Sequence, residues 1–217
     1  MDALTTVLSW VDRHFSVDLP FLRFARNVLL LSLIGLAPML ALYIALASDL
    51  WSHLLGADAA LARFARQIAT NGLPVVLAVN AVGFILFGQL RANRLRPGIA
   101  LALDIPVRIG VFIALHAVIY PASALMFGSF GGDPLQALRV VGPTLARAAA
   151  FENLSGVYLY ATLISALPLH MALIGGVLQR RGYPNPSFLV VILSALMVFG
   201  LQALLLTGFA LLLVAPV

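Results

Sequence analysis

The chain has 217 residues, of which 62% are hydrophobic and only 10% are charged, and its net charge is +5. A soluble domain usually carries about 25% charged residues, so this composition excludes a water-soluble globular protein and indicates that lipid is the solvent. Cysteine is absent, which excludes disulfides, thiolate metal sites and cysteine nucleophiles. The basic residues flank apolar stretches, so they indicate contact with anionic lipid headgroups rather than with nucleic acid.

Residues 1–26 form a polar leader with an amphipathic pattern. Its apolar side chains recur at helical spacing, which predicts a cytoplasmic helix lying in the membrane interface. Arg23 and Arg26 follow on one helical face and mark the cytoplasmic end of the first span. The apolar face of this predicted interfacial helix comprises Leu4, Val7, Leu8, Val11 and Phe15.

Five later stretches are apolar and long enough to cross a bilayer. They must form helices, because hydrocarbon offers no hydrogen-bond partners to an open backbone. The first also resembles a cleaved signal sequence ending in ALAS, but the long leader favours a retained anchor. We predict an all-α integral membrane protein with a single domain over 1–217, a five-helix transmembrane bundle and amphipathic interfacial helices at the N-terminus and outside the membrane. The predicted spans are 27–48, 72–90, 98–120, 154–178 and 188–214.

Arginine supplies all of the Lys+Arg content, and its distribution predicts the orientation. With the N-terminus inside, eight arginines lie on the cytoplasmic side and four, including Arg139 and Arg147, lie outside. We therefore expect a bacterial inner-membrane protein with a cytoplasmic N-terminus and an external C-terminus. Contacts with anionic lipid or with the interface are predicted for Arg23, Arg26, Arg63, Arg66, Arg91, Arg94, Arg96, Arg180 and Arg181.

The tetrapeptide RFAR occurs at 23–26 and again at 63–66. Only one predicted span separates the copies, whereas a parallel duplication needs an even number, so an internal repeat is disfavoured. The second copy is predicted on an interfacial helix that Asp58 caps and that ends at Asn71-Gly72. Both copies fit helices whose arginines reach toward the headgroups. An outer anion site at the second copy is the functional alternative.

A further amphipathic segment, 127–150, is predicted to lie on the outer side as an interfacial or re-entrant hairpin. Asp133 is the expected N-cap of its helix, and Gly142-Pro143 is expected to break that helix. Asn153 is expected to cap the fourth span in the same way.

Asp104 and Arg108 in the motif DIPVR are the strongest functional candidates. They are four residues apart on one helical face, so Arg108 can reach back to Asp104. If the span starts at Gly98, the pair lies about 9 to 15 Å along the helix axis. If the span is 106–127 instead, the pair lies at the cytoplasmic interface. Three interpretations stay open at this point: an interfacial position, a structural ion pair inside the bundle, and a transport or proton path.

Three other polar residues lie within predicted spans: Asn80, His116 and His170. The two histidines are on antiparallel helices at different depths, about 10 to 15 Å apart by helical rise. That separation disfavours a shared haem or metal. Hydrogen bonds between helices are the expected role of all three residues.

The sequence contains no nucleotide-binding loop, zinc-binding HExxH motif, GxSxG elbow or Ser/His/Asp set. We therefore expect no catalytic residues, no metal, no cofactor and no enzymatic activity; a lipid-modifying enzyme is the least favoured class.

The favoured hypothesis is a non-catalytic accessory, scaffold or assembly subunit of a larger membrane complex. Its expected partners are the bilayer, anionic lipids, and other membrane subunits or a second copy. The alternative is a small transporter or channel that uses Asp104 and Arg108. Pairs of small residues, such as Gly110/Ala114 and Ala161/Ser165, favour close helix packing.

Overall fold

The computed structural model describes residues 9–11, 13–15, 18–47, 50–56, 59–183 and 187–214, and within these ranges every regular element is helical. Four helices are long and apolar enough to cross a membrane, or five if α8 and α9 together form one bent span. The elements are α2 (Phe21–Leu46), α3 (Leu50–Gly56), α4 (Ala60–Gln67), the π-helical turn η1 (Ile68–Gly72), α5 (Leu73–Ala92), α6 (Pro97–Phe127), the 3-10 turn η2 (Ser129–Gly132), α7 (Pro134–Ala149), α8 (Leu154–Ser165), α9 (Leu167–Arg180) and α10 (Phe188–Val214).

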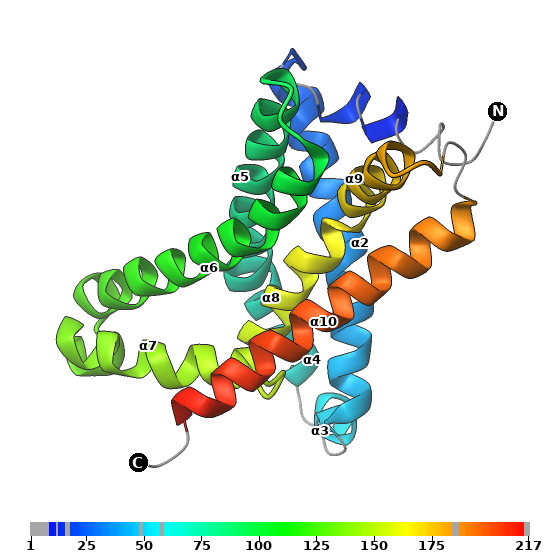
Figure 1. The fold of residues 1–217 in the computed structure, drawn as a ribbon. Helices are drawn as coiled ribbons and strands as arrows, with labels where there is room; N and C mark the ends of the chain where they lie inside the picture. The colour runs from blue at the N-terminus through cyan, green and yellow to red at the C-terminus, as the bar shows by residue number, and fades with distance from the viewer. Residues whose placement is uncertain are drawn as a thin grey trace.

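The long helices run back and forth between two ends of the molecule (Figure 1). Helix α2 packs against α5 and α8, whereas α6 packs against α5, α7 and α9. Helices α6 and α7 form a hairpin that extends to one side of α2 (Figure 1). Helix α10 lies against α7 and α9. This arrangement is compatible with the predicted membrane bundle, in which successive spans alternate in direction.

Small residues allow α2 and α8 to cross closely. A methyl group added to Gly35 on α2 would collide with the Ser165 hydroxyl and the Ala161 carbonyl on α8. The Ser165 hydroxyl donates to the Leu31 carbonyl of α2 at 2.9 Å. The predicted contact at Ala161/Ser165 is therefore confirmed. At Gly110 the prediction is wrong, since an added methyl group would meet no other atom there.

The helix carrying the second RFAR copy does not end at Asn71-Gly72. Residues Ala60–Ala92 run on as one 33-residue helical stretch through η1. In this π-helical turn, the Leu73 amide donates to the carbonyl of Ile68, five residues earlier. The turn precedes Pro74, which has no amide to donate, so the locally altered bonding pattern accommodates the proline without ending the helix.

Helix α6 covers both of the alternative third spans, since it extends over 31 residues with Pro106 inside it. Helix α7 also continues through Pro143, contrary to the predicted break. Buried residues lie on both sides of the proline, Ala137 and Val141 before it and Ala148 after it, so packing holds both halves of the helix in place. The Asp133 cap is confirmed, because its carboxylate accepts from the Leu135 amide at 2.8 Å.

The predicted interfacial helix at the N-terminus needs two corrections. Helix α2 begins at Phe21, so the first RFAR copy lies inside its first turns rather than ahead of the span. Val11 and Phe15 are buried, and the Phe15 ring lies 4.4 Å from the ring of Phe84 on α5. Part of the predicted lipid-facing surface thus packs on the bundle. The predicted positions at Leu4, Val7, Leu8 and Asp58 lie outside the described residues.

Candidate functional site

Asp104 and Arg108 lie in the interior of the helical bundle. The side chains are adjacent on α6, where Arg108 Nε donates to Asp104 Oδ1 at 3.0 Å and to Oδ2 at 3.1 Å. Arg108 is fully buried and Asp104 is 5% exposed. The pair is therefore buried inside the protein rather than exposed at its surface. Other helices cover this part of α6, which the sequence of α6 alone does not reveal.

Helix α5 receives the guanidinium group of Arg108. Asn80 Oδ1 accepts a hydrogen bond from Arg108 Nη1 at 2.6 Å. The guanidinium carbon lies 4.8 Å from the centre of the Phe84 ring, within the range of a cation–π contact. A methyl group added to Gly83 would collide with the guanidinium, so this glycine provides the space that Arg108 occupies. One face of α5 therefore supplies a hydrogen bond, an aromatic ring and room for the cation.

Asn80 connects the guanidinium to a third helix. Its Nδ2 donates to the Ser32 hydroxyl of α2 at 2.8 Å, and both residues are fully buried. The expectation that Asn80 forms a hydrogen bond between helices is confirmed. In addition, the same amide bonds to Arg108 through its oxygen, so both ends of the side chain are used.

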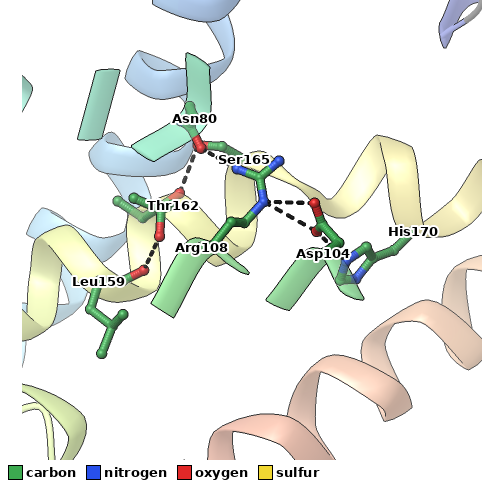
Figure 2. A network of polar contacts seen from close by, with 8 residues as sticks. Asn80, Asp104, Arg108, Leu159, Thr162, Ser165 and His170 are labelled. Atoms are coloured by element: carbon green, nitrogen blue, oxygen red, sulfur yellow. Dashed lines mark hydrogen bonds and ion pairs between the residues drawn. The ribbon is translucent and has the colours of Figure 1, made fainter. Parts of the chain in front are cut away.

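His170 reaches Asp104 from the opposite side. The His170 Nε2 atom lies 2.8 Å from Asp104 Oδ2, and the imidazole is fully buried. Figure 2 shows the carboxylate between the guanidinium and this ring. His170 lies on α9, just beyond the 41° bend that separates α8 from α9. Pro168 stands at the start of α9 and lacks the amide that would continue the α8 ladder, which accounts for a bend here.

These contacts define a buried polar network that joins four helices: Ser32, Asn80, Asp104, Arg108 and His170. With a neutral imidazole the network has no net charge, because one carboxylate balances one guanidinium. Two nitrogens, Arg108 Nη2 and His170 Nδ1, have no hydrogen-bond partner among the described residues. The network is therefore balanced in charge, while two of its buried nitrogens keep the capacity to bind a further polar group.

His116 lies apart from this network, as the sequence predicted for the two histidines. It is eight residues beyond Arg108 on α6, about 12 Å along the axis. Its Nδ1 atom lies 2.9 Å from the Phe112 carbonyl, and its Nε2 atom lies 3.3 Å from the Ser155 hydroxyl of α8. Among the residues that the structure describes, no three histidine, cysteine, aspartate or glutamate side chains gather as a metal site.

The nine arginines predicted at the interface are all exposed. One group lies where α5 turns into α6 and where α9 ends, and there Arg91, Arg94 and Arg180 line a cavity of about 330 Å³. Arg23 and Arg26 line a separate cavity of about 440 Å³ with His14. Arg63 and Arg66 lie on α4, away from both groups (Figure 1). The structure thus brings three of the predicted lipid-contacting residues together.

The sequence reasoning missed Ser32, Gly83 and Phe84. Serine and glycine are frequent in membrane helices, so neither stands out as a partner of a charge. One signal was available in the second predicted span. Asn80 and Gly83 are three residues apart, so a polar and a small residue share one helical face, which indicates room for a polar partner. Comparison of the chain with family models, with curated proteins and with solved structures found no match.

Proposed function

We propose that the protein is a small membrane transporter or channel in which the buried polar network carries protons. The observation that carries this proposal is the position of Asp104 between a permanent cation, Arg108, and a titratable base, His170. Ionisable groups inside a membrane span are costly and are typical of ion or proton pathways. The same chemistry underlies the alternative function that the sequence suggested.

The charge balance of the network supports the proposal. With a neutral His170 the charges of the network sum to zero, so no uncompensated charge lies in a medium of low dielectric. Uptake of one proton at the imidazole adds one positive charge directly beside the Asp104 carboxylate. The network therefore has two protonation states that differ by one unit of charge, which is the minimum a proton carrier needs.

The bend between α8 and α9 supplies the moving part. It lies next to His170, and discontinuous helices beside a binding site are common in transporters. Rotation of α9 about this bend would move the imidazole relative to Asp104 while α6 stays in place. Five spans do not divide into two equal halves, so a second copy of the chain would supply the remaining half of a two-fold transporter.

The test uses the purified protein in liposomes loaded with a pH-sensitive dye, with a potential applied by potassium and valinomycin. We expect proton flux from the wild type. His170→Gln keeps a hydrogen-bond donor toward Asp104 but cannot cycle a proton, so flux should fall to that of protein-free liposomes. His116→Gln makes the same chemical change outside the network and is the matched control. Absence of flux in the wild type, or equal flux from His170→Gln, would reject the proposal.

A non-catalytic accessory or scaffold subunit is the second candidate, and α10 favours it. Only 11% of its apolar membrane window is buried in the protein, against 44% for the Ala60–Ala92 helix. Its outward side chains, such as Leu193, Met197 and Leu204, are exposed and apolar, so they suit either lipid or another subunit. Native purification in lipid particles separates the candidates, because this role requires a stoichiometric partner.

The membrane and the orientation belong to the same proposal: a bacterial inner membrane with the N-terminus in the cytoplasm. The arginines at the α5–α6 turn and at the end of α9 would then meet anionic headgroups on the inner face. Single cysteines at Arg94 and Ser129 should react with an impermeant reagent from opposite sides of the membrane. Labelling from the same side would contradict this topology.

A further inference from the structure

A second polar region, which includes His116, surrounds a cavity of about 690 Å³. This volume lies within the range of sites that hold small organic ligands, about 300–1,000 Å³. Four parts of the chain contribute to it: the α4–η1–α5 helix, the second half of α6, η2 and the start of α8. Side chains of the polar network do not line it, so it is a separate site.

Most of the cavity wall is apolar, and its polar groups carry no permanent charge. Leu115, Ile119 and Leu154 supply apolar surface, whereas Thr70, Asn71, Ser123 and Ser129 supply hydroxyl and amide groups. None of the described residues that line it is an arginine, aspartate or glutamate, and the chain contains no lysine. A phosphate or carboxylate would lose its hydration here without gaining a counter-ion, so a charged headgroup is disfavoured.

Tyr158 provides a hydrogen-bond donor without a partner. The side chain lines the cavity and is 6% exposed, and its hydroxyl has no hydrogen-bond partner among the residues that the structure describes. An unpaired buried hydroxyl is unfavourable, so its retention favours a ligand oxygen as the missing acceptor. Its ring lies directly against Gly72, where an added methyl group would collide with it.

His116 and Ser155 provide an acceptor on the same wall. A backbone carbonyl can only accept, so the contact with Phe112 assigns the proton to His116 Nδ1 and leaves a lone pair on Nε2. The Ser155 hydroxyl donates to that lone pair, and its own oxygen can then accept from a ligand hydroxyl. This part of the wall therefore offers a donor, from Tyr158, and an acceptor, from Ser155.

Two backbone irregularities border the cavity. The π-helical turn η1 places Thr70 and Asn71 on the wall, and such turns are frequent at functional sites. Phe130 in η2 has a left-handed backbone with φ +55, which is unfavourable for a residue other than glycine. This backbone places its ring 5.4 Å from that of Tyr120, so the two rings stack at the cavity wall.

We propose that this cavity binds an uncharged acylglycerol lipid, with a free hydroxyl on its head and an ester carbonyl beside it. The Tyr158 hydroxyl donates to the ester carbonyl, and the Ser155 oxygen accepts from the free hydroxyl. The acyl chains lie against the leucine and isoleucine side chains of α6 and α8. A mostly apolar wall that carries neutral donors and acceptors, but no permanent charge, selects this headgroup over a phospholipid.

The probe is a diacylglycerol with a diazirine in one acyl chain, incorporated with the full-length protein in lipid nanodiscs. Photolabelling followed by peptide mass spectrometry should concentrate on 67–78, 115–130 and 154–158, and excess dioctanoylglycerol should compete. Tyr158→Phe removes only the hydroxyl and should weaken competition by about three- to tenfold. Tyr183→Phe makes the same change at an exposed tyrosine and serves as the matched control.

A second variant protects the test against failure to fold. Ala78→Phe fills the cavity from α5 and should reduce labelling of all three segments, while Tyr158→Phe keeps the cavity shape. Labelling spread evenly over the lipid-facing helices would overturn the proposal, as would equal competition with Tyr158→Phe or equal labelling by a diazirine phosphatidic acid. The double variant Asp104→Leu/Arg108→Met should label like the wild type, so failure of proton flux and failure of lipid binding are distinguishable.

Discussion

The two polar regions of the bundle differ in how their side chains are satisfied. The buried polar network contains the permanent charges, and each charged group contacts another charged or polar side chain. The cavity near His116 contains no permanent charge and leaves the Tyr158 hydroxyl without a partner among the described residues. An unpaired buried charge costs far more than an unpaired hydroxyl. The charged groups of the network are therefore enclosed by partners on neighbouring helices, whereas neutral polar groups line the cavity.

Removal of one member of the ion pair should give the largest effect on stability. Asp104→Ala or Arg108→Ala leaves the other residue buried without its counter-ion and should lower the free energy of unfolding by about 3–5 kcal/mol. Replacement of both, as Asp104→Leu with Arg108→Met, should recover most of this loss. Thermal unfolding in detergent measures each variant, with Arg139→Ala on the exposed face of α7 as the control. If both single variants lower the free energy of unfolding only slightly, the ion pair does not contribute to stability as its burial implies.

Gly83→Ala tests whether the network is closely packed around the guanidinium. The added methyl group collides with Arg108, and overpacking of this kind typically costs about 1–3 kcal/mol. Gly110→Ala is the matched control, because it adds the same group on α6 where nothing is in reach. We expect a lower melting temperature for the first variant and an unchanged or higher one for the second. Equal melting temperatures would mean that the space beside Gly83 is larger than the structure indicates.

Ser32→Ala tests the α2 end of the network and should have a smaller effect on stability. It removes the acceptor of the Asn80 amide without touching a charge, so the expected loss is about 0.5–1.5 kcal/mol. Ser123→Ala removes a serine hydroxyl at the cavity wall and is the comparison. Chemical unfolding in mixed micelles resolves a difference of this size. A loss as large as that of Arg108→Ala would show that Ser32 also positions the guanidinium through Asn80.

Tyr158→Phe should have the smallest effect on stability in the absence of ligand. Its hydroxyl has no partner to lose, so the expected change is within about 0.5 kcal/mol and can be stabilising. Comparison of melting temperatures with and without dioctanoylglycerol then separates stability from binding. The wild type should gain more from the lipid than the variant does. A marked loss of stability without lipid would indicate that this hydroxyl makes a structural hydrogen bond. It would contradict the view that the cavity leaves the Tyr158 hydroxyl without a partner.

The sequence by itself determined the all-helical class and the approximate bounds of the candidate spans. In long apolar runs with little charge, a helix satisfies every backbone hydrogen bond within the segment. The structure has four or five candidate spans, close to the predicted ranges. Local capping was also predictable, as at Asp133 and Asn153, because a cap depends on only a few adjacent residues. The ion pair of Asp104 and Arg108 was predictable for the same reason, since the two residues share one helical face.

Only the tertiary structure decided whether that pair is buried and which residues surround it. Asn80 and His170 are polar residues on different helices, and their contact with α6 depends on how α5 and α9 pack against it. Helix continuity at Asn71-Gly72 and Pro143 was equally undetermined, since packing can outweigh a weak local preference. The cavity near Tyr158 arises from four separate parts of the chain. The apolar pattern specifies which stretches become helices, whereas contacts between helices depend on side-chain shape and on buried hydrogen bonds.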